Sequence, residues 1–292
     1  MGVEMNSICM QCQLRRGLSI AQAQGSDAAA TAFARDLMRA LSSVPPGMDS
    51  TQFGALAEAL LRRHYPVGED RLYDERRQSN RFALSRADRI TAAVEASEDP
   101  VFTAIQYSIL SNYIDFSALH GQVSYDTLDD MLSDVSGIVL DGETYRQFCR
   151  DMETAKKLLY LTDNAGEVVF DRIVMETFRK KYPDLEITVC VRGAPVFNDA
   201  LRQDAEEAGI RFPVIDNGIR VGGTPLSRIG KEAADAINAA DVIFAKGMGN
   251  VESMLGCGYN VYYAFLVKCE RLMQVFDKPK MTPMFLSEKM FQ

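Results

Sequence analysis

The sequence predicts an α/β protein in which a helical N-terminal region precedes a Rossmann-like, mostly parallel sheet with helices on both faces. Apolar residues recur at a spacing near 3.6 through the first 155 residues, which is typical of amphipathic helices. After that point short apolar runs alternate with amphipathic stretches, and this alternation indicates parallel strands covered by helices. We therefore divide the chain into a helical N-terminal subdomain (1–155) and an α/β domain (156–292).

Short segments rich in proline and glycine divide the helical region. Breaks fall at 44–50, 65–70 and 98–100. Pro100 suits the first position of a helix that runs through Ile109, because the N–H that proline lacks has no partner at that position. The remaining predicted helices cover 28–41, 53–63, 72–82 and 85–96.

The α/β region begins with the apolar run LLYLT and contains further short runs of the same kind. We expect a helix over 226–239, and the residues from Asp277 onward, with Pro279 and Pro283, are predicted to form an irregular tail. The predicted strands are 158–162, 187–191, 211–215, 241–245 and 261–267.

Composition excludes several classes of protein. The chain has 292 residues, of which 47% are hydrophobic and 25% charged, and these values are ordinary for a globular protein. A net charge of −8 argues against a general nucleic-acid-binding surface. No apolar run approaches the ~20 residues that span a bilayer, so no membrane association is expected. The first residues lack the basic and apolar regions of a signal peptide, and we expect a cytoplasmic location.

The cysteines and histidines restrict the possible chemistry. The six cysteines fit a reducing compartment better than a disulfide scaffold. Cys9 and Cys12 form a C-x-x-C without a second pair or nearby histidine; local packing is the leading interpretation, with metal binding and a redox or oligomer-contact role as alternatives. The two histidines, His64 and His120, lie outside any motif, so a histidine base is not expected.

Polar side chains follow the first predicted strand of the α/β region. In the segment LTDNAGEVVFD, Asp163 and Asn164 come directly after the strand, and Glu167 lies in the first turn of the helix that follows. Ligands of open α/β sheets bind outside the carboxyl ends of the strands, and an acid with an amide there suits a hard cation. An Asx turn with a helix N-cap is the alternative for Asp163 and Asn164, and a favourable interaction with the helix dipole is the alternative for Glu167.

The pattern recurs after two later strands. In RGAPVFND, Arg192 ends a strand and Asp199 precedes a helix; in KGMGNVE, Lys246 ends a strand and a glycine loop leads to Asn250 and Glu252. In a parallel sheet these loops share one edge and converge. Together they bring three oxygen donors (Asp163, Asn164, Asp199) and two cations (Arg192, Lys246) to one place, which suits a divalent metal and an anionic substrate, most simply a phosphate. A glycine-rich loop after the third strand (216–226) is either a backbone cradle for substrate or a surface turn, with Asp216 as its one candidate contact.

These three segments resemble the signature segments of the damage-control phosphatases, metal-dependent enzymes long catalogued as domain of unknown function 89. ICMQC and SNYIDFSAL are similar to segments of the stand-alone microbial branch with an N-terminal CxxC, and the resemblance runs from Ile8 to Glu270. One departure is Ser111, where the family usually has glycine before the asparagine of the NxID segment. The resemblance implies Mn²⁺, Co²⁺ or Ni²⁺ rather than Mg²⁺, and phosphorylated sugars or damaged phosphometabolites as substrates.

We therefore expect a metal-dependent phosphatase in which a metal-activated water hydrolyses a small phosphomonoester. The expected metal ligands are Asp163, Asn164 and Asp199, the expected catalytic residues are Glu167, Lys246 and Asp163, and the expected substrate contacts are Arg192, Asn250, Glu252, Asn112 and Asp115. Glu167 is expected to position the water or to act as base, and Lys246 to neutralise charge on the phosphate.

Four alternatives remain. A non-catalytic protein that binds metal or sugar phosphate would use the same ligand set, and a carboxylate methyltransferase is a further possibility, although Gly166 stands alone where a glycine-rich loop is expected. An aspartyl-phosphate enzyme needs a second carboxylate two residues after Asp163, where this chain has Ala165. A dinucleotide-dependent oxidoreductase needs glycine where this chain has Glu252.

Overall fold

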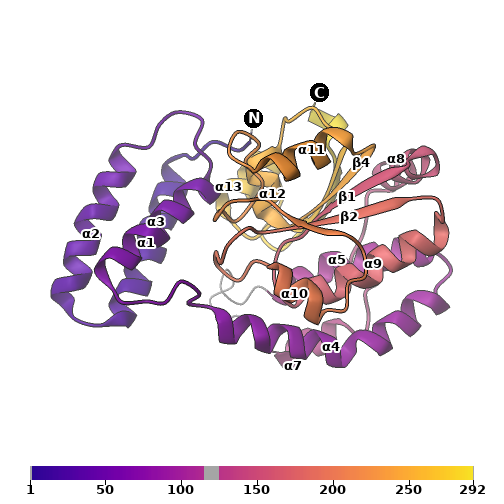
Figure 1. Cartoon of the computed structure of the whole chain (residues 1–292), viewed down its shortest axis with the longest axis horizontal. Helices are drawn as coiled ribbons and strands as arrows, with labels where there is room; N and C mark the ends of the chain where they lie inside the picture. Colours follow the sequence, from indigo (N-terminus) through magenta and orange to yellow (C-terminus); the bar gives the residue numbers. More distant parts are fainter. Residues whose placement is uncertain (1, 115–124, 292) are drawn as a thin grey trace.

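The computed structural model describes residues 2–114 and 125–291, and it confirms the predicted α/β class (Figure 1). A six-stranded sheet carries helices on both faces, and three helices at the N-terminal end form a group beside it. The helices are α1 (Ser7–Gln24), α2 (Asp27–Ser42), α3 (Ser50–His64), α4 (Tyr73–Ala96), α5 (Pro100–Ser111), α7 (Tyr125–Met131), α8 (Gly142–Thr154), α9 (Glu167–Lys181), α10 (Arg202–Glu207), α11 (Lys231–Ala239), α12 (Gly247–Met254) and α13 (Glu270–Phe276), with short 3-10 helices η1 (Asn112–Ile114) and η2 (Glu288–Phe291).

The sheet places a topological switch point at its centre. Its strands are β1 (Lys157–Leu161), β2 (Glu186–Val191), β3 (Val214–Asp216), β4 (Val242–Lys246), β5 (Val261–Leu266) and β6 (Pro283–Ser287). Their spatial order is β3-β2-β1-β4-β5-β6, and all neighbours are parallel except β5 and β6. Because β1 leads to β2 on one side and lies next to β4 on the other, the loops after β1 and β4 diverge and leave room for a ligand.

Each face of the sheet packs against its own set of helices. On β1, Leu158 and Tyr160 join a core built with α4, α5, α8 and α9, whereas Leu159 and Leu161 join a core built with α11, α12 and α13. This alternation follows from the two-residue period of a strand, and it explains why β1, β4 and β5 are almost wholly apolar.

Helices α1 to α3 have a hydrophobic cluster of their own that includes Phe33, Leu37 and Phe53. We call α1 to α3 the N-terminal helix group; it contacts the rest of the chain through α12 and α13. The backbone N–H groups of Gly2 and Val3 also donate to the carbonyls of Leu255 and Glu252, both at 2.6 Å. The domain boundary at residue 155 stays a prediction; α4, α5 and α8 share a core with the sheet.

Two helix predictions differ from the structure. The helices predicted over 72–82 and 85–96 are one helix, α4, because no proline or glycine interrupts the segment and Ser85 directs its hydroxyl to the Phe82 carbonyl. The helix predicted over 226–239 begins only at Lys231, because residues before it form a turn in which Arg228 N–H donates to the Pro225 carbonyl.

The prediction of an irregular tail after Asp277 was wrong. Residues 283–287 form the edge strand β6, which pairs antiparallel with β5 and buries Met284, Phe285 and Leu286. Pro283 is tolerated because it opens the strand, where a missing N–H removes no essential ladder bond. The third predicted strand is shorter than expected and covers only Val214–Asp216. Within residues 2–114 and 125–291, no helix has both the length and the apolar character needed to cross a bilayer.

Replacing Phe148 by alanine should lower the free energy of unfolding by about 3–5 kcal/mol. This ring on α8 is fully buried and lies 5.0–6.0 Å from the rings of Phe178, Phe244, Tyr262 and Phe285, so its removal leaves a cavity lined by aromatic groups. Urea denaturation would measure the change. Val139→Ala is the control, because Val139 is 75% exposed, and an equal loss in both variants would contradict the assignment of this core.

Candidate active site

Three strand-end loops meet at the switch point. Asp163 and Asn164 follow β1, and the loop after β2 runs antiparallel beside them through a bridge between Asn164 and Asp199. The Ala200 N–H donates to the Asp163 carbonyl at 2.7 Å, and the Ala165 N–H donates to the Asn198 carbonyl at 2.9 Å. Backbone bonds therefore fix the position of these side chains relative to one another.

Glu167 is the centre of a buried polar network below this edge. Its Oε1 accepts hydrogen bonds from the Nδ2 atoms of Asn112 (2.7 Å) and Asn164 (2.6 Å), and its Oε2 accepts one from Lys246 Nζ (2.9 Å). Lys246 Nζ also lies 3.1 Å from Oδ1 of Asp171, which Tyr160 contacts through its hydroxyl at 2.7 Å. The side chains of Glu167, Lys246 and Asp171 are fully buried, so this network connects η1, β1, α9 and β4 away from solvent.

Lys246 is held as a cation inside this network. Burial alone would lower the pKa of Lys246, but the carboxylates of Asp171 and Glu167 outweigh it and raise the pKa above its ordinary value. For Asp171, burial is the largest influence and raises the pKa of its carboxyl, opposed by the charge of Lys246. Lys246 and Glu167 are therefore a paired, desolvated ion couple below the site surface.

Asp163 stands between this network and the solvent-facing cavity. Its Oδ2 accepts hydrogen bonds from Asn112 Nδ2 (3.0 Å) and Asn164 Nδ2 (2.9 Å). Burial raises the pKa of Asp163 well above its ordinary value, and the negative charges of Glu167 and Asp199 raise it further, while Lys268 and Arg192 act in the opposite direction. The crowding of carboxylates is the electrostatic condition that a bound cation relieves.

Arg192 faces two of the carboxylates. Its Nε donates to Asp199 Oδ2 at 2.6 Å, and its Nη2 lies 4.0 Å from Asp163 Oδ1. Nη2 is buried and has no hydrogen-bond partner in the described part of the chain. The Nη2 amino group of this fully buried guanidinium is thus without a hydrogen-bond partner among the described residues.

Asn250 fastens the loop after β4. Its Nδ2 donates to the carbonyls of Lys246 (2.7 Å) and Thr162 (3.1 Å), and its Oδ1 accepts from the Thr224 hydroxyl at 2.8 Å. Its contacts therefore hold the backbone at Lys246 and Thr162, whereas the sequence predicted a substrate contact for Asn250.

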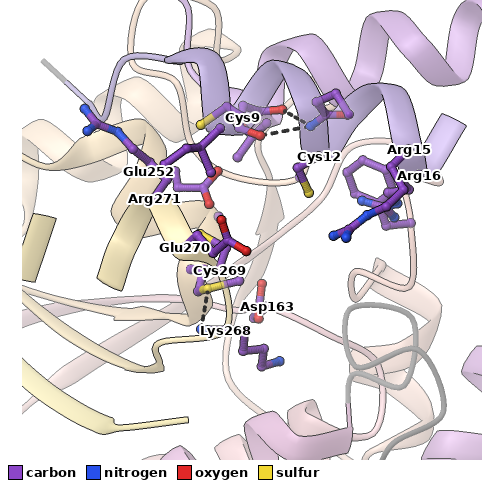
Figure 2. Close-up of a pocket in the computed structure, with 18 of the residues that line it drawn as sticks. Cys9, Cys12, Arg15, Arg16, Asp163, Glu252, Lys268, Cys269, Glu270 and Arg271 are labelled. Atoms are coloured by element: carbon purple, nitrogen blue, oxygen red, sulfur yellow. Dashed lines mark hydrogen bonds between the residues drawn. The ribbon is translucent and has the colours of Figure 1, made fainter. Parts of the chain in front are cut away.

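Above Asp163 lies a cavity of about 320 Å³ that extends to the N-terminal helix group (Figure 2). The predicted ligands Asp163, Asn164 and Asp199 line it from the sheet edge. Residues of α1 line the opposite side, and Figure 2 shows Cys12 projecting from α1 on the side that faces Asp163. Glu252 lines the same cavity, together with Lys268.

The predicted site residues thus fall into two layers. Asp163, Asn164, Asp199 and Glu252 line the cavity. A second set lies outside its lining and contacts these residues or the loops that carry them: Asn112, Glu167, Arg192, Lys246 and Asn250. Asp115 lies outside the described residues. Asp216 does not reach the cavity; it contacts Arg202, whereas Gly222 of the same glycine-rich segment does line it.

Three groups of site residues carry no signal in the local sequence pattern. Asp171 is the last letter of a quoted motif, but its pairing with Lys246 depends on the contact between α9 and β4. Arg15 and Arg16 reach the cavity only because the N-terminal helix group folds over the sheet edge. Asn80 of α4 accepts a hydrogen bond from the Gly166 N–H at 2.7 Å and so holds the turn after Asn164.

Cys9 and Cys12 both line the cavity, Cys9 buried and Cys12 exposed. Burial raises the pKa of the Cys9 thiol. In residues 2–114 and 125–291, no three His, Cys, Asp or Glu side chains are gathered closely enough to hold a metal ion. The C-x-x-C pair thus has no third ligand of these types there, and the candidate set at the sheet edge consists of two carboxylates and an amide.

Comparison with known proteins bears on the family and the fold. A profile of the damage-control phosphatase ARMT1-like domain matches residues 5–282. A damage-control phosphatase of Pyrococcus horikoshii is 31% identical over 61% of this chain; the alignment spans 61% of that relative, less than two thirds of its length. A damage-control phosphatase of Archaeoglobus fulgidus is 31% identical over 74% of this chain and 75% of its own. The crystal structure of a DUF89 family protein from P. horikoshii superposes with a TM-score of 0.84 at 24% identity, covering 98% of this chain and 99% of its own, which supports the fold.

Replacing Gly247 by alanine should displace Asp163 and weaken any cation binding there. A Cβ atom at Gly247 would lie 1.9 Å from Asp163 Oδ2, and the backbone has φ +76°. Gly256→Ala is a matched control, because Gly256 has φ +80° with no atom within 4 Å of its added Cβ. Both variants should lose about 1–2 kcal/mol of stability from the left-handed backbone. Only Gly247→Ala should also lose Mn²⁺ binding by calorimetry; equal binding in the two variants would contradict the close contact.

Replacing Glu252 by glutamine should remove a fall in stability with rising pH. Burial, with the nearby charge of Asp49, raises the pKa of Glu252 to about 8, although Arg16 partly opposes the shift. Since an unfolded glutamate titrates near ~4.3, the folded protein retains a proton that the unfolded chain releases between these values. This contribution to stability is therefore present at acid pH and lost as pH rises through about 8. Urea unfolding at pH 5 and pH 9 tests it, and parallel pH curves for both proteins would contradict it.

Proposed function

The chain belongs to the damage-control phosphatase ARMT1-like domain family, and on that premise we propose that it is a metal-dependent phosphatase of small phosphomonoesters. The observation that carries the proposal is the convergence of Asp163, Asn164 and Asp199 on one wall of the cavity. Arg192 and Lys268 add positive charge to the same place, as their opposing influence on the pKa of Asp163 indicates. Oxygen donors beside cations suit a metal ion with a phosphate bound to it.

The donor set fits a hard divalent cation. Asp163 and Asp199 supply carboxylate oxygens, and Asn164 directs its Nδ2 to Asp163 and Glu167, so its Oδ1 is the atom available to a cation. Burial raises the pKa of Asp163, repulsion from the carboxylates of Glu167 and Asp199 raises it further, and a bound cation would stabilise the ionised form. A bound metal ion would supply Lewis-acid polarisation of the phosphate and a water of lowered pKa. We propose Mn²⁺, Co²⁺ or Ni²⁺ ahead of Mg²⁺.

Two cations of the chain would neutralise the phosphate oxygens. Lys268 lies in the cavity wall, whereas Arg192 lies outside the lining and acts through its charge from behind Asp163, where its Nη2 has no hydrogen-bond partner among the described residues. Both act on charge that grows in the transition state, where preformed donors contribute most. Lys246 lies below the cavity and pairs with Glu167 and Asp171, so it stabilises these buried carboxylates. By offsetting their charge it also reduces their repulsion of the carboxylates at the cavity surface.

We assign to Glu167 the positioning of Asp163 and Asn164. Any proton transfer by Glu167 requires one of its hydrogen bonds to break. Both of its oxygens are engaged, Oε1 by two amides and Oε2 by Lys246. Through Asn112 and Asn164 it fixes the orientation of Asp163. Asn112 is itself held by the Leu266 N–H at 3.3 Å.

The proposed substrates are phosphorylated sugars or damaged phosphometabolites in the cytoplasm. A cavity of about 320 Å³ falls at the lower end of the range for small-molecule sites, which fits a metabolite rather than a phosphoprotein.

Replacing Asp163 by alanine should abolish metal-restored phosphate release, because the variant loses a ligand and the acceptor of two amide hydrogen bonds. The assay would use chelator-treated protein with Mn²⁺, Co²⁺, Ni²⁺ or Mg²⁺, an aryl phosphate and a panel of sugar phosphates. Asp216→Ala is the control, a strand-end aspartate outside the cavity lining, and it should retain activity. Metal binding without any phosphate release in the unaltered protein would instead favour a non-catalytic binding function.

Replacing Glu167 by glutamine should lower kcat by about 10²-fold or more while leaving Mn²⁺ bound. Asp171→Asn is the comparison, since it removes the other acidic partner of Lys246 without touching the amides. A large loss of kcat only in the Glu167 variant would show that the effect arises from the positioning of Asp163 and Asn164. Equal losses would assign it to the pairing of Lys246, and full activity in Glu167→Gln would remove Glu167 from the mechanism.

A further inference from the structure

The cavity lining holds basic side chains beside four carboxylates, those of Asp163, Asp199, Glu252 and Glu270. The chain carries a net charge of −8, yet five basic side chains line this one cavity: Arg15, Arg16, Lys268, Arg271 and Lys280. Lys268 lies close enough to Asp163 to serve the phosphate proposed above. The remaining cations exceed what a single phosphate at the sheet edge requires.

Arg15 and Arg16 are the pair without an assigned partner. Both come from α1, and neither makes an ion pair or hydrogen bond with the described residues. Arginines elsewhere in the described chain commonly have carboxylate partners, as Arg76 and Arg77 do with Asp204. Glu252 is near enough to be influenced by the charge of Arg16, but no contact within 4.0 Å joins the two. Two guanidinium groups therefore line the cavity with their donors available.

Phe197 fixes the orientation of Arg16. The Arg16 guanidinium carbon lies 4.2 Å from the centre of the Phe197 ring, a cation–π contact that holds the charged group without using its hydrogen-bond donors. The ring itself is confined: a Cβ added at Gly54 or Gly222 would lie 2.8 or 2.9 Å from it. Its backbone has φ 46°, a conformation that a bulky residue adopts only where its surroundings require it. Phe197 thus forms a rigid platform between α3 and the loop that carries Asp199.

Arg15 and Arg16 lie on a different side of the cavity from Arg271, and Glu252 is the carboxylate that the charge of Arg16 influences. Figure 2 shows Arg15 and Arg16 on one side and Glu252, Glu270 and Arg271 on the other, with Asp163 below. On the side of Arg271, two carboxylates offset its charge. Among the described lining residues, α1, α3 and Phe197 contribute no carboxylate, so Arg15 and Arg16 are the charges that these elements bring to the cavity.

We propose that Arg15 and Arg16 form a second anion subsite, and that the substrate is a phosphomonoester whose leaving group carries another phosphate or a carboxylate. This inference rests on the proposed phosphatase function, because the first phosphate is assigned to the edge formed by Asp163, Asn164 and Asp199. The planar, bidentate geometry of guanidinium groups suits either anion.

A matched set of substrates tests the subsite. Glucose 6-phosphate, 6-phosphogluconate and glucose 1,6-bisphosphate share the phosphate at carbon 6 and differ at carbon 1, which is neutral, a carboxylate or a phosphate. The metal-loaded protein should show a kcat/KM about tenfold or more higher for at least one of the charged pair than for glucose 6-phosphate. The better of the two identifies which anion the subsite takes.

Arg15→Gln and Arg16→Gln should remove this advantage by raising KM for the charged substrate, while kcat and the values for glucose 6-phosphate stay within about twofold. Arg15 is exposed and has no contact to lose, so its variant separates an effect on binding from a failure to fold. Arg63→Gln is the control: Arg63 is an exposed arginine of the same helix group, has no ion pair in the described chain and lies outside the cavity lining. It should behave as the unaltered protein.

Two results would overturn the subsite. One is an equal kcat/KM for all three substrates; the other is an advantage of the charged substrate that persists in the double variant of Arg15 and Arg16. If no substrate is hydrolysed, the proposed function fails, and the subsite is then judged by calorimetry. Glucose 1,6-bisphosphate or 6-phosphogluconate should bind more tightly than glucose 6-phosphate, and the double variant should lose the difference.

Discussion

The buried ion pair between Glu167 and Lys246 is the constraint on which the rest of the site depends. Both side chains have no solvent exposure, so either charge alone would be very costly in this position. Glu167 begins α9 after β1, and Lys246 ends β4, so their pairing closes the switch point of the sheet from below. The remaining acceptor capacity of Glu167 is filled by Asn112 and Asn164, and these amides in turn hold Asp163.

This arrangement separates a rigid, desolvated layer from an accessible one. In the lower layer the charges of Glu167, Asp171 and Lys246 face one another, with Tyr160 donating a further hydrogen bond to Asp171. In the upper layer Asp163 and Asp199 share Arg192, and burial together with the charges of Glu167 and Asp199 raises the pKa of Asp163 although Arg192 and Lys268 oppose the shift. The layer that faces the cavity is therefore the one with capacity for a cation, and the layer beneath keeps its ligands in place.

The sequence predicts the residues of the upper layer because each of them is marked by the apolar strand that precedes it. Asp163, Asn164 and Asp199 follow apolar strands, and parallel strands bring such residues to one edge, where the structure places them. The pairing of Lys246 with Asp171 depends on how α9 packs across β4, and strand β6 depends on an edge that β5 leaves open; neither is encoded by periodicity. Arg15 and Arg16 read as ordinary surface residues of an amphipathic helix, because only the folding of α1 over the sheet edge makes them part of a cavity.

The cavity thus has two walls of different origin. One comes from the carboxyl edge of the sheet, whose backbone bonds between Asp163 and Ala200 allow little variation. The other comes from α1, where Arg16 packs against Phe197 of the loop after β2; Gly54 of α3 lies next to the same ring, and Gly2 and Val3, which precede α1, donate hydrogen bonds to Leu255 and Glu252. If the sheet edge performs the chemistry, then a change of residue on α1 alters what the leaving group may carry without altering the groups that act on the phosphate. On this proposal, substrate choice in this protein depends on the first helix and on Phe197, against which Arg16 packs.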